Sequence, residues 1–470
     1  AGLWVFSILG MVYCFGFAVI NSLLVLYAST AFHLSTKEAY LLSACYNSLL
    51  FTAPLLGGYL SEKAGYHLSL MLGPVLATLS FACLSTLDQT WYYIGLGLFV
   101  TATAYFVPSL YVMIGKLFSK DDPARESAYT LQYIIMNLGF LLGGLLGGYL
   151  HIWFNYRIEF LIGMCTSLSI LPIYLFLRKW IVPEEGRITG SQLGLSPLFN
   201  MLLLVLIAFG IVLCSYFVLR NPTQYDVIII GLVLIISLAI AIEALKRKKQ
   251  ERRKLFTFLI LSYFSIAFWT LYSMEPALLT VFINKFVDRH LFGALIPSTS
   301  FYALDPLFVI FFGSILSYVW LYLARKKRNP SLPAKFALSL LIMSFGFPIL
   351  VLGIHLTSPL SLISPYFIIA AYVLFAIAEL LISPIGIDMV ERLSPEGMEG
   401  RLMGVWQLFT GVAGAMAGIL SQLAVVPKKT PPALVHGVYS SAFLRIGAIT
   451  FVIAVLAFLI RPYLLKLLRS

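Results

Sequence analysis

Residues 365–390 read PYFIIAAYVLFAIAELLISPIGIDMV, an apolar run with one acid, Glu379, near its centre and a second, Asp388, nine residues later. A helix needs about 20 apolar residues to cross roughly 30 Å of hydrocarbon. This stretch is therefore long enough to span a membrane. It is continuously apolar and does not alternate, which excludes a strand of a membrane barrel.

Runs of the same kind recur along the whole chain. Hydrophobic residues make up 60% of the sequence and charged residues 11%, whereas soluble domains carry about 25% charged residues. The sequence therefore predicts an all-α polytopic membrane protein with fourteen spans. The expected spans are 4–28, 38–60, 67–86, 92–118, 126–150, 157–178, 197–219, 225–245, 256–283, 302–323, 335–356, 365–390, 401–425 and 437–465.

The basic residues indicate how the spans are oriented. If alternate loops face alternate sides, one side receives the runs 246–254 (KRKKQERRK) and 325–328 (RKKR) and most other Lys and Arg residues. Cytoplasmic loops carry such an excess, so both termini are predicted to be cytoplasmic. The net charge of +12 then reflects contact with anionic lipid rather than with nucleic acid. The basic residues on the other side are Lys37, Arg157, Arg220, Lys285, Arg289, Lys428, Lys429 and Arg445.

A weak internal repeat divides the chain. Pro108 precedes the glycine-rich segment that begins at Gly139 by 31 residues, and Pro384 precedes Gly414 by 30 residues. Secondary transporters are often built from repeated halves. We therefore expect six-helix bundles at 1–180 and 255–470, and a linker at 181–254 that carries two extra membrane helices. The glycines should let neighbouring helices approach closely.

Two smaller features narrow the class. The cysteines lie inside expected spans without metal or disulfide spacing, so we interpret all five as buried apolar residues: Cys14, Cys45, Cys83, Cys165 and Cys214. The chain opens almost at once on an apolar run that does not resemble a cleavable signal peptide, so we expect residues before Ala1 to be missing.

Ionisable side chains inside the spans are candidates for function, because a charge at membrane depth is costly. Glu379 has no charged residue within eight positions, so we expect it to bind a proton or an ammonium group. Glu275 precedes a proline and is a candidate to face a cavity. Asp305 fits a ligand role or a helix end-cap role almost equally. Asp388 is expected to pair with Arg392 four residues later.

These residues lie in segments that resemble the proton-coupled oligopeptide transporters, a branch of the major facilitator superfamily. The strongest segments are VDRHLFGALIPSTSFYALDPLFVIFF, ending at Phe312, and AELLISPIGIDMVERLSPEGMEGRLMGVWQLFTG, within 372–418. The stretch 54–63, PLLGGYLSEK, is similar to the signature of the superfamily loop between the second and third spans. The resemblance covers nearly the whole chain and implies two six-helix bundles plus an inserted helix pair.

The resemblance also implies a substrate site. Glu379 matches the tenth-helix glutamate that receives the amino terminus of a peptide, with Ser383 and Trp406 beside it. Asn137 matches an asparagine of the substrate pocket. Asp305 stands where the family has an asparagine.

Other positions depart from the family pattern. The first helix of the family bears an ExxER motif linked to proton coupling, but residues 10–18 read GMVYCFGFA, which includes Phe17 and no acid. Asn21 replaces an arginine, Val107 a lysine and Phe51 a tyrosine. The cations expected to bind a peptide carboxylate are therefore missing.

The seventh helix also departs from the pattern. Ser273 occupies the position of the family glutamate, and Glu275 lies two residues later, which is about 200° around an α-helix. We take Glu379, Glu275 and Asp305 as the candidates for proton coupling. The predicted substrate-binding residues are Glu379, Ser383, Trp406, Asn137, Asp305, Asn21, Phe17 and Phe51.

Three functions compete. The first is secondary active transport of peptides or peptide-like molecules by alternating access, coupled to protons. The second is carriage or export of an amine-bearing or modified substrate without ordinary proton coupling, which the missing cations favour. The third is a ligand sensor or receptor without transport.

An enzyme is excluded by the lack of a metal cluster, nucleophile elbow or phosphate loop in the short polar segments. We expect no metal and no cofactor, with a proton gradient as the driving force. The expected location is the plasma membrane, specifically a bacterial inner membrane. The expected partners are the substrate, protons and lipid, and we expect a monomer that does not bind nucleic acid.

Overall fold

A computed structural model describes residues 2–118, 124–177, 196–291, 293–328, 330–358, 361–395, 398–427 and 430–469. Within these ranges, fourteen helical segments are long and apolar enough to cross a membrane. This number agrees with the sequence prediction. The polar segment at 181–195 and the pair Lys428 and Lys429 lie outside the described residues.

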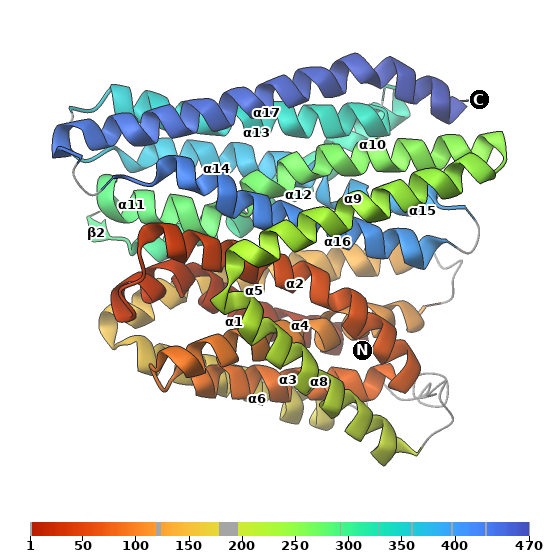
Figure 1. The fold of residues 1–470 in the computed structure, drawn as a ribbon, viewed down its shortest axis with the longest axis horizontal. Helices are drawn as coiled ribbons and strands as arrows, with labels where there is room; N and C mark the ends of the chain where they lie inside the picture. The colour runs from red at the N-terminus through yellow and green to blue at the C-terminus, as the bar shows by residue number, and fades with distance from the viewer. Residues whose placement is uncertain are drawn as a thin grey trace. The chain divides into compact units, whose positions relative to one another are not determined.

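Helices form most of the described chain (Figure 1). The helices of the first half are α1 (Gly2–Ala31), α2 (Thr36–Ala64), α3 (Tyr66–Leu84), α4 (Gln89–Lys116), α5 (Ala124–Trp153), α6 (Tyr156–Leu177), α8 (Pro197–Arg220) and α9 (Pro222–Lys246). Those of the second half are α10 (Lys249–Tyr272), η2 (Glu275–Leu279), α11 (Thr280–Phe286), η3 (Ser298–Ala303), α12 (Leu304–Arg325), α13 (Leu332–His355), α14 (Pro365–Leu380), α15 (Ser383–Leu393), α16 (Glu399–Ser421), η4 (Gln422–Ala424) and α17 (Pro432–Arg469).

The contacts divide the chain into two compact units. Unit 1 comprises Ala1–Leu34, Leu49–Pro222 and Thr299–Ala303, and unit 2 comprises Ser35–Ser48, Thr223–Ser298 and Leu304–Ser470. The inserted helix pair is shared, since α8 belongs to unit 1 and α9 to unit 2. The predicted domain boundaries at 180 and 254 stay a prediction.

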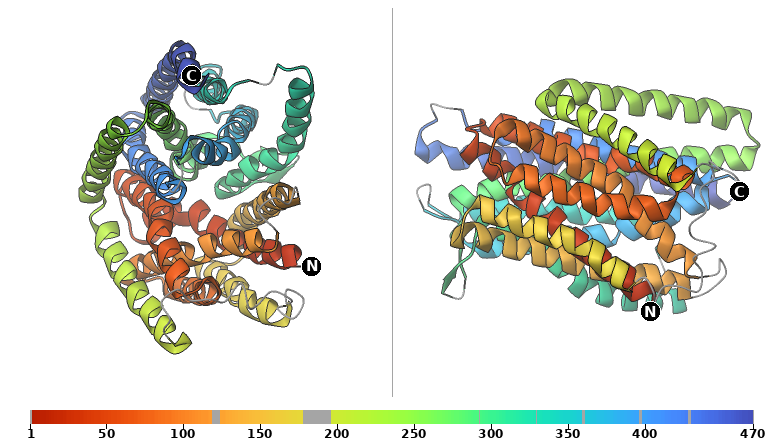
Figure 2. Two further views of the ribbon diagram at one scale, coloured as in Figure 1. Left: turned by 90° about the vertical axis from the view of Figure 1, so that its right-hand side faces the viewer. Right: turned by 90° about the horizontal axis from the view of Figure 1, so that it is seen from below.

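Glycines let the helices of unit 1 pack closely. A Cβ built on Gly139 of α5 would lie 2.2 Å from the carbonyl oxygen of Met11 on α1, and one on Gly143 would lie 2.3 Å from that of Phe15. Both distances are too short for a side chain, so the two backbones meet only where glycine is present. Helix α1 also runs along α6, as Figure 2 shows.

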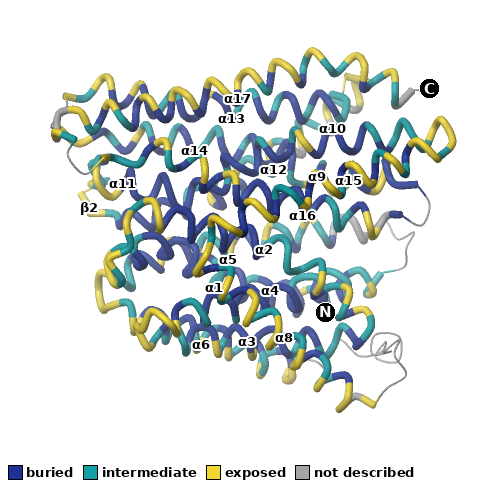
Figure 3. The backbone as a smooth tube through the Cα atoms, viewed as in Figure 1, coloured by how far each residue is buried: buried dark blue, intermediate teal, exposed yellow. Residues whose placement is uncertain are grey.

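Unit 2 is built around long antiparallel packing. Helices α13 and α17 run side by side over most of their length (Figure 1). Figure 3 shows exposed residues along one side of α17 and buried or half-buried residues along the other. The exposed side includes Leu444, Val452 and Leu459, which is typical of a surface covered by lipid.

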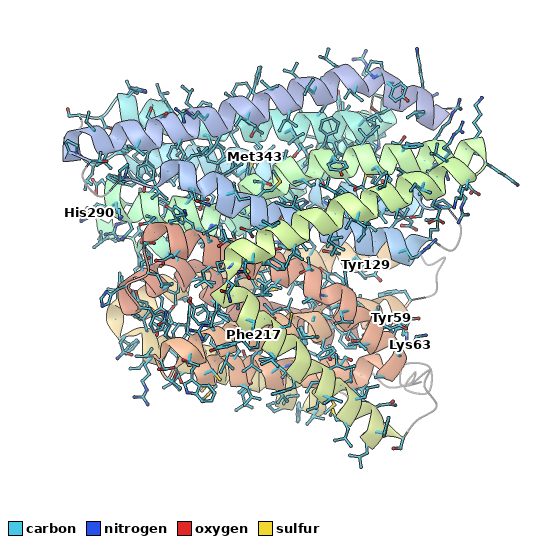
Figure 4. All side chains as sticks on the ribbon, viewed as in Figure 1. Tyr59, Lys63, Tyr129, Phe217, His290 and Met343 are labelled. Carbon is cyan, nitrogen blue, oxygen red and sulfur yellow. The ribbon has the colours of Figure 1, made fainter. Side chains whose placement is uncertain are left out.

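A short hairpin follows α11. Strand β1 (His290–Leu291) pairs antiparallel with β2 (Ala294–Leu295), and Gly293 between them has a φ of +82° that glycine adopts without strain. The Nδ1 atom of His290 lies 2.7 Å from Oδ1 of Asp288 in this segment. Figure 4 labels His290, together with Tyr59 and Lys63 of the 54–63 stretch, where the Lys63 ammonium lies 5.8 Å from the Tyr59 ring centroid.

Two smaller predictions have different outcomes. The Nε atom of Arg392 donates to Asp388 across 2.7 Å, so the expected pairing is confirmed. The prediction that all cysteines are buried holds for Cys14 and Cys45, but Cys83 is half-buried. The prediction is wrong for Cys165 and Cys214, which are exposed. They lie on apolar helix faces of α6 and α8, where apolar character reflects a lipid-facing surface rather than a protein core.

Candidate functional site

Three acidic side chains of unit 2 lie where helices become irregular. Helix α10 ends at Tyr272, and Glu275 is the first residue of η2, a π-helical turn. Such turns are rare and occur frequently at functional sites. Because the backbone leaves the α-helical path here, the 200° rotation expected between Ser273 and Glu275 does not apply.

The other two acids also flank helix ends. Asp305 is the second residue of α12, and α12 directly follows the 3-10 helix η3. Glu379 lies in the last turn of α14, which stops at Leu380 before α15 begins at Ser383. Pro384 lacks a backbone N–H and cannot continue a helix from the preceding turn. The single span expected at 365–390 is thus two helices, and Glu379 lies just before the break.

The side chains of these three acids meet in unit 2. The carboxyls of Asp305 and Glu379 approach within hydrogen-bonding reach, and Glu275 interacts electrostatically with both. The hydroxyl of Tyr272 donates to Oδ2 of Asp305 across 3.3 Å. Their exposed fractions are only 1% for Glu275, 3% for Asp305 and 6% for Glu379. Glu379 has no charged neighbour in the sequence, but in space it lies beside two acids.

This arrangement favours a proton or a cation. Two carboxyl groups within hydrogen-bonding reach cannot both stay ionised without a positive charge between them. None of the Lys and Arg side chains whose burial the structure describes is buried. The acidic cluster, Glu275, Asp305 and Glu379, can therefore be neutralised by protons or by the ammonium group of a ligand.

The backbone around Glu379 is held in place. The Ser339 hydroxyl of α13 donates to the carbonyl of Ala378 across 2.7 Å, and the Ile382 N–H donates to the carbonyl of Glu379 across 3.0 Å. Serine hydroxyls commonly satisfy carbonyls freed at a break in a membrane helix. The position of the Glu379 backbone is thus fixed by two neighbours.

Two further predicted residues belong to the same unit. Trp406 of α16 is buried, and its ring lies 2.3 Å from the position that a Cβ on Gly386 would occupy. Gly386 follows half-buried Ser383 by three residues on α15. The tryptophan therefore packs directly on the helix that begins after Glu379.

The remaining predicted residues lie in unit 1. Asn21 of α1 donates to the carbonyl of Phe17 across 3.3 Å, and Asn137 of α5 donates to the carbonyl of Tyr133 across 3.0 Å. Phe17 contacts the ring of Phe140 edge to face with a centroid distance of 5.4 Å. Phe51 of α2 is half-buried. These side chains provide amide and aromatic groups without charge.

Sequence reasoning missed Tyr272, whose hydroxyl contacts the acidic cluster. A signal was present, because Tyr272 lies three residues before Glu275 on an expected span. Asp305 fits the ligand interpretation better than the end-cap interpretation, since its carboxyl is buried and bonded to another helix. The described residues contain no group of three or more His, Cys, Asp or Glu side chains suited to a metal ion.

Together, the many membrane-length helices and the buried acidic cluster are typical of a polytopic membrane carrier. The POT family model matches residues 68–441. The chain belongs to this family of membrane transporters, so it is a multi-pass membrane transporter and not an enzyme. The predicted family and the major facilitator fold are confirmed.

Individual relatives agree with this assignment. The chain is 29% identical to "Dipeptide and tripeptide permease A" of Erwinia pyrifoliae over 456 residues, which cover 96% of this chain and 91% of that protein. A crystal structure of the peptide transporter POT in complex with sulfate matches with a TM-score of 0.85 at 21% identity, covering 100% of this chain and 96% of that one. A POT family transporter in complex with 5-aminolevulinic acid matches with a TM-score of 0.82 at 21% identity, covering 98% and 96%.

Proposed function

We propose that this protein transports peptides or peptide-like small molecules that carry a positively charged amino group, using a proton gradient and alternating access. The observation that carries the proposal is the meeting of Glu275, Asp305 and Glu379 from three helices of unit 2. In a setting of low polarity, carboxylates attract an ammonium group strongly. The names of the related permeases support peptides as the substrate class.

The same carboxyls support proton coupling. A carboxyl pair that is neutralised either by a proton or by a substrate amine links the two binding events, because occupancy by one changes the affinity for the other. In the first helix, residues 10–18 provide no carboxyl. Proton coupling in this protein is therefore assigned to the acidic cluster of unit 2.

A second candidate function is transport of a substrate that has an amine but no free carboxylate. Asn21, Val107 and Phe51 occupy the places where the family resemblance implies an arginine, a lysine and a tyrosine. None of the Lys and Arg side chains with described burial is buried, which favours ligands whose carboxyl end is blocked or absent. Such a substrate needs no cationic partner in the protein.

Reconstituted vesicles with an inward proton gradient test these proposals. The probes are alanyl-alanine, its N-acetylated form without the amine, and its C-terminal amide without the carboxylate. We expect saturable uptake of the first, loss of uptake after acetylation, and retained uptake of the amide. Absence of both saturable uptake and binding of alanyl-alanine and its amide contradicts the proposal. Saturable binding without uptake identifies a sensor instead.

The location and topology are inferred from the loops. The basic runs at 246–254 and 325–328 support cytoplasmic termini and contact with anionic lipid, and the bacterial relatives support an inner membrane. We infer that the protein works as a monomer without a bound cofactor. Reporter fusions at each terminus check the orientation, and light scattering of the purified protein checks the oligomeric state.

A further inference from the structure

A fourth buried carboxyl, which the proposed site does not use, lies in unit 1. Glu159 of α6 has an exposed fraction of 0%, and both of its carboxyl oxygens are buried. Neither oxygen has a hydrogen-bond partner among the described residues. An unpaired carboxylate in such a place is costly, so the group requires a proton or a cation.

The surroundings of Glu159 are small and uncharged. Its Oε1 atom lies 3.2 Å from the position of a Cβ on Gly147 of α5, and the Ser22 hydroxyl of α1 lies 3.4 Å from the same point. That hydroxyl already donates to the carbonyl of Val19. The glycine thus leaves room for a carboxyl between α1, α5 and α6.

Glu159 is not needed as a helix cap. The side chain of Asn155 caps α6, since its Oδ1 accepts from the Ile158 N–H across 2.9 Å. The first turn of a helix does favour negative charge, but this effect is smaller than the cost of burying an unpaired carboxylate. A proton is therefore the simplest neutralising partner for Glu159.

Half-buried titratable side chains lie near Glu159. Tyr156, three residues earlier on α6, interacts electrostatically with Glu159 and is half-buried. Its ring stacks on half-buried His151 of α5 with a centroid distance of 4.0 Å, and its hydroxyl lies 3.2 Å from that of exposed Thr30 on α1. The ring of buried Tyr27 on α1 lies 4.7 Å from that of Tyr156.

We propose that Glu159 is a proton-binding site of unit 1 that exchanges protons with water on the side lined by the half-buried Tyr156 and His151. The site provides a carboxyl in a unit whose first helix has no acid at residues 10–18. Loss of the proton places a charge between α1, α5 and α6, so the packing of these helices depends on pH.

Infrared spectroscopy of the purified protein in lipid nanodiscs tests the site without any transport. The protonated Glu159 carboxyl should give a C=O stretching band of a buried acid, which Glu159→Gln removes and Glu159→Asp shifts. The double variant His151→Gln, Tyr156→Phe should slow the deuterium shift of this band at least severalfold. An unchanged spectrum in both Glu159 variants contradicts proton binding at Glu159. An unchanged rate of the deuterium shift in the double variant contradicts proton exchange on the side of Tyr156 and His151. Glu159→Asp retains an acid, so it serves if the glutamine variant does not fold.

An effect on transport rests on the proposed function and needs a separate measurement. In Glu159→Gln, the ratio of alanyl-alanine uptake rates at acidic and neutral pH should fall at least severalfold. The control Glu38→Gln changes an exposed acid and should behave as the parent protein does. A Glu159 band in a protein that transports nothing keeps the site and refutes the proposed function. Transport by a protein that shows no Glu159 band refutes the site and keeps the proposed function.

Discussion

The first helix of unit 1 and the acidic cluster of unit 2 differ in how their buried polar groups are accommodated. In α1, Asn21 bonds to a carbonyl of its own regular helix, and neighbouring α5 approaches through Gly139 and Gly143. In unit 2, each of Glu275, Asp305 and Glu379 flanks an irregular helix end. Regular helices satisfy their own backbone and pack tightly, whereas interrupted helices direct side chains and backbone groups toward ligands.

Removal of the Glu379 carboxylate gives the largest expected effect. It tests directly whether the acidic cluster of unit 2 binds the ligand. Glu379→Gln should reduce binding of alanyl-alanine about 100-fold, because a buried pair of a carboxylate and an ammonium contributes about 2–5 kcal/mol. Isothermal calorimetry measures the affinity.

The matched control for this change is Asp388→Asn on α15, since that acid pairs with Arg392 near the surface. The control should bind the dipeptide as the parent protein does. Equal affinity of the parent and Glu379→Gln removes Glu379 from the site.

A substitution of Asp305 tests whether the carboxyls of Asp305 and Glu379 share a proton. Asp305→Asn retains a group that can accept from Tyr272 but removes one of two adjacent carboxyls. The ratio of uptake rates at acidic and neutral pH should fall about tenfold, which corresponds to a change of roughly one unit in proton affinity. Tyr272→Phe is the control, because it removes the hydrogen bond and keeps both carboxyls. An unchanged pH profile in Asp305→Asn contradicts the shared-proton interpretation.

The tight packing of unit 1 predicts a moderate loss of stability. Gly139→Ala places a Cβ 2.2 Å from the Met11 carbonyl oxygen, and overpacking of this kind costs about 1–3 kcal/mol. Thermal unfolding in detergent should show a lower melting temperature. Gly210→Ala is the matched control, because nothing lies within 4 Å of its Cβ position. Equal melting temperatures for the two variants show that the α1–α5 approach is looser than described.

The smallest effect is expected outside both regions, in the hairpin segment. The hydrogen bond from His290 lowers the pKa of Asp288 below its ordinary value. Such a contribution to stability is present above the unfolded pKa of the aspartate and is lost as pH falls through the lowered pKa. His290→Gln should return the pKa of Asp288 toward its ordinary value, as followed by carboxyl NMR. Any fall in melting temperature at neutral pH should be small, since both side chains are exposed.

The sequence predicted the fourteen spans well, because continuous apolar runs leave a clear pattern. It did not predict the meeting of Glu275 with Asp305 and Glu379. Regular helix α10 ends at Tyr272 before Glu275, whereas the helical angle derived from residue spacing assumes a continuous α-helix. Glu159 was missed because a single acid near a span end is also typical of an exposed helix start. Apolar character likewise did not distinguish a buried cysteine from an exposed one.

The π-helical turn at 275–279 makes this segment sensitive to the insertion or deletion of a single residue. A π turn holds about one residue more than an α turn, and one residue corresponds to about 100° of rotation. Deletion of a single residue after Glu275 would turn α11 by about 100° relative to Glu275. In this segment, a change of chain length by one residue alters how an acid is oriented relative to the helix that follows it, without any substitution.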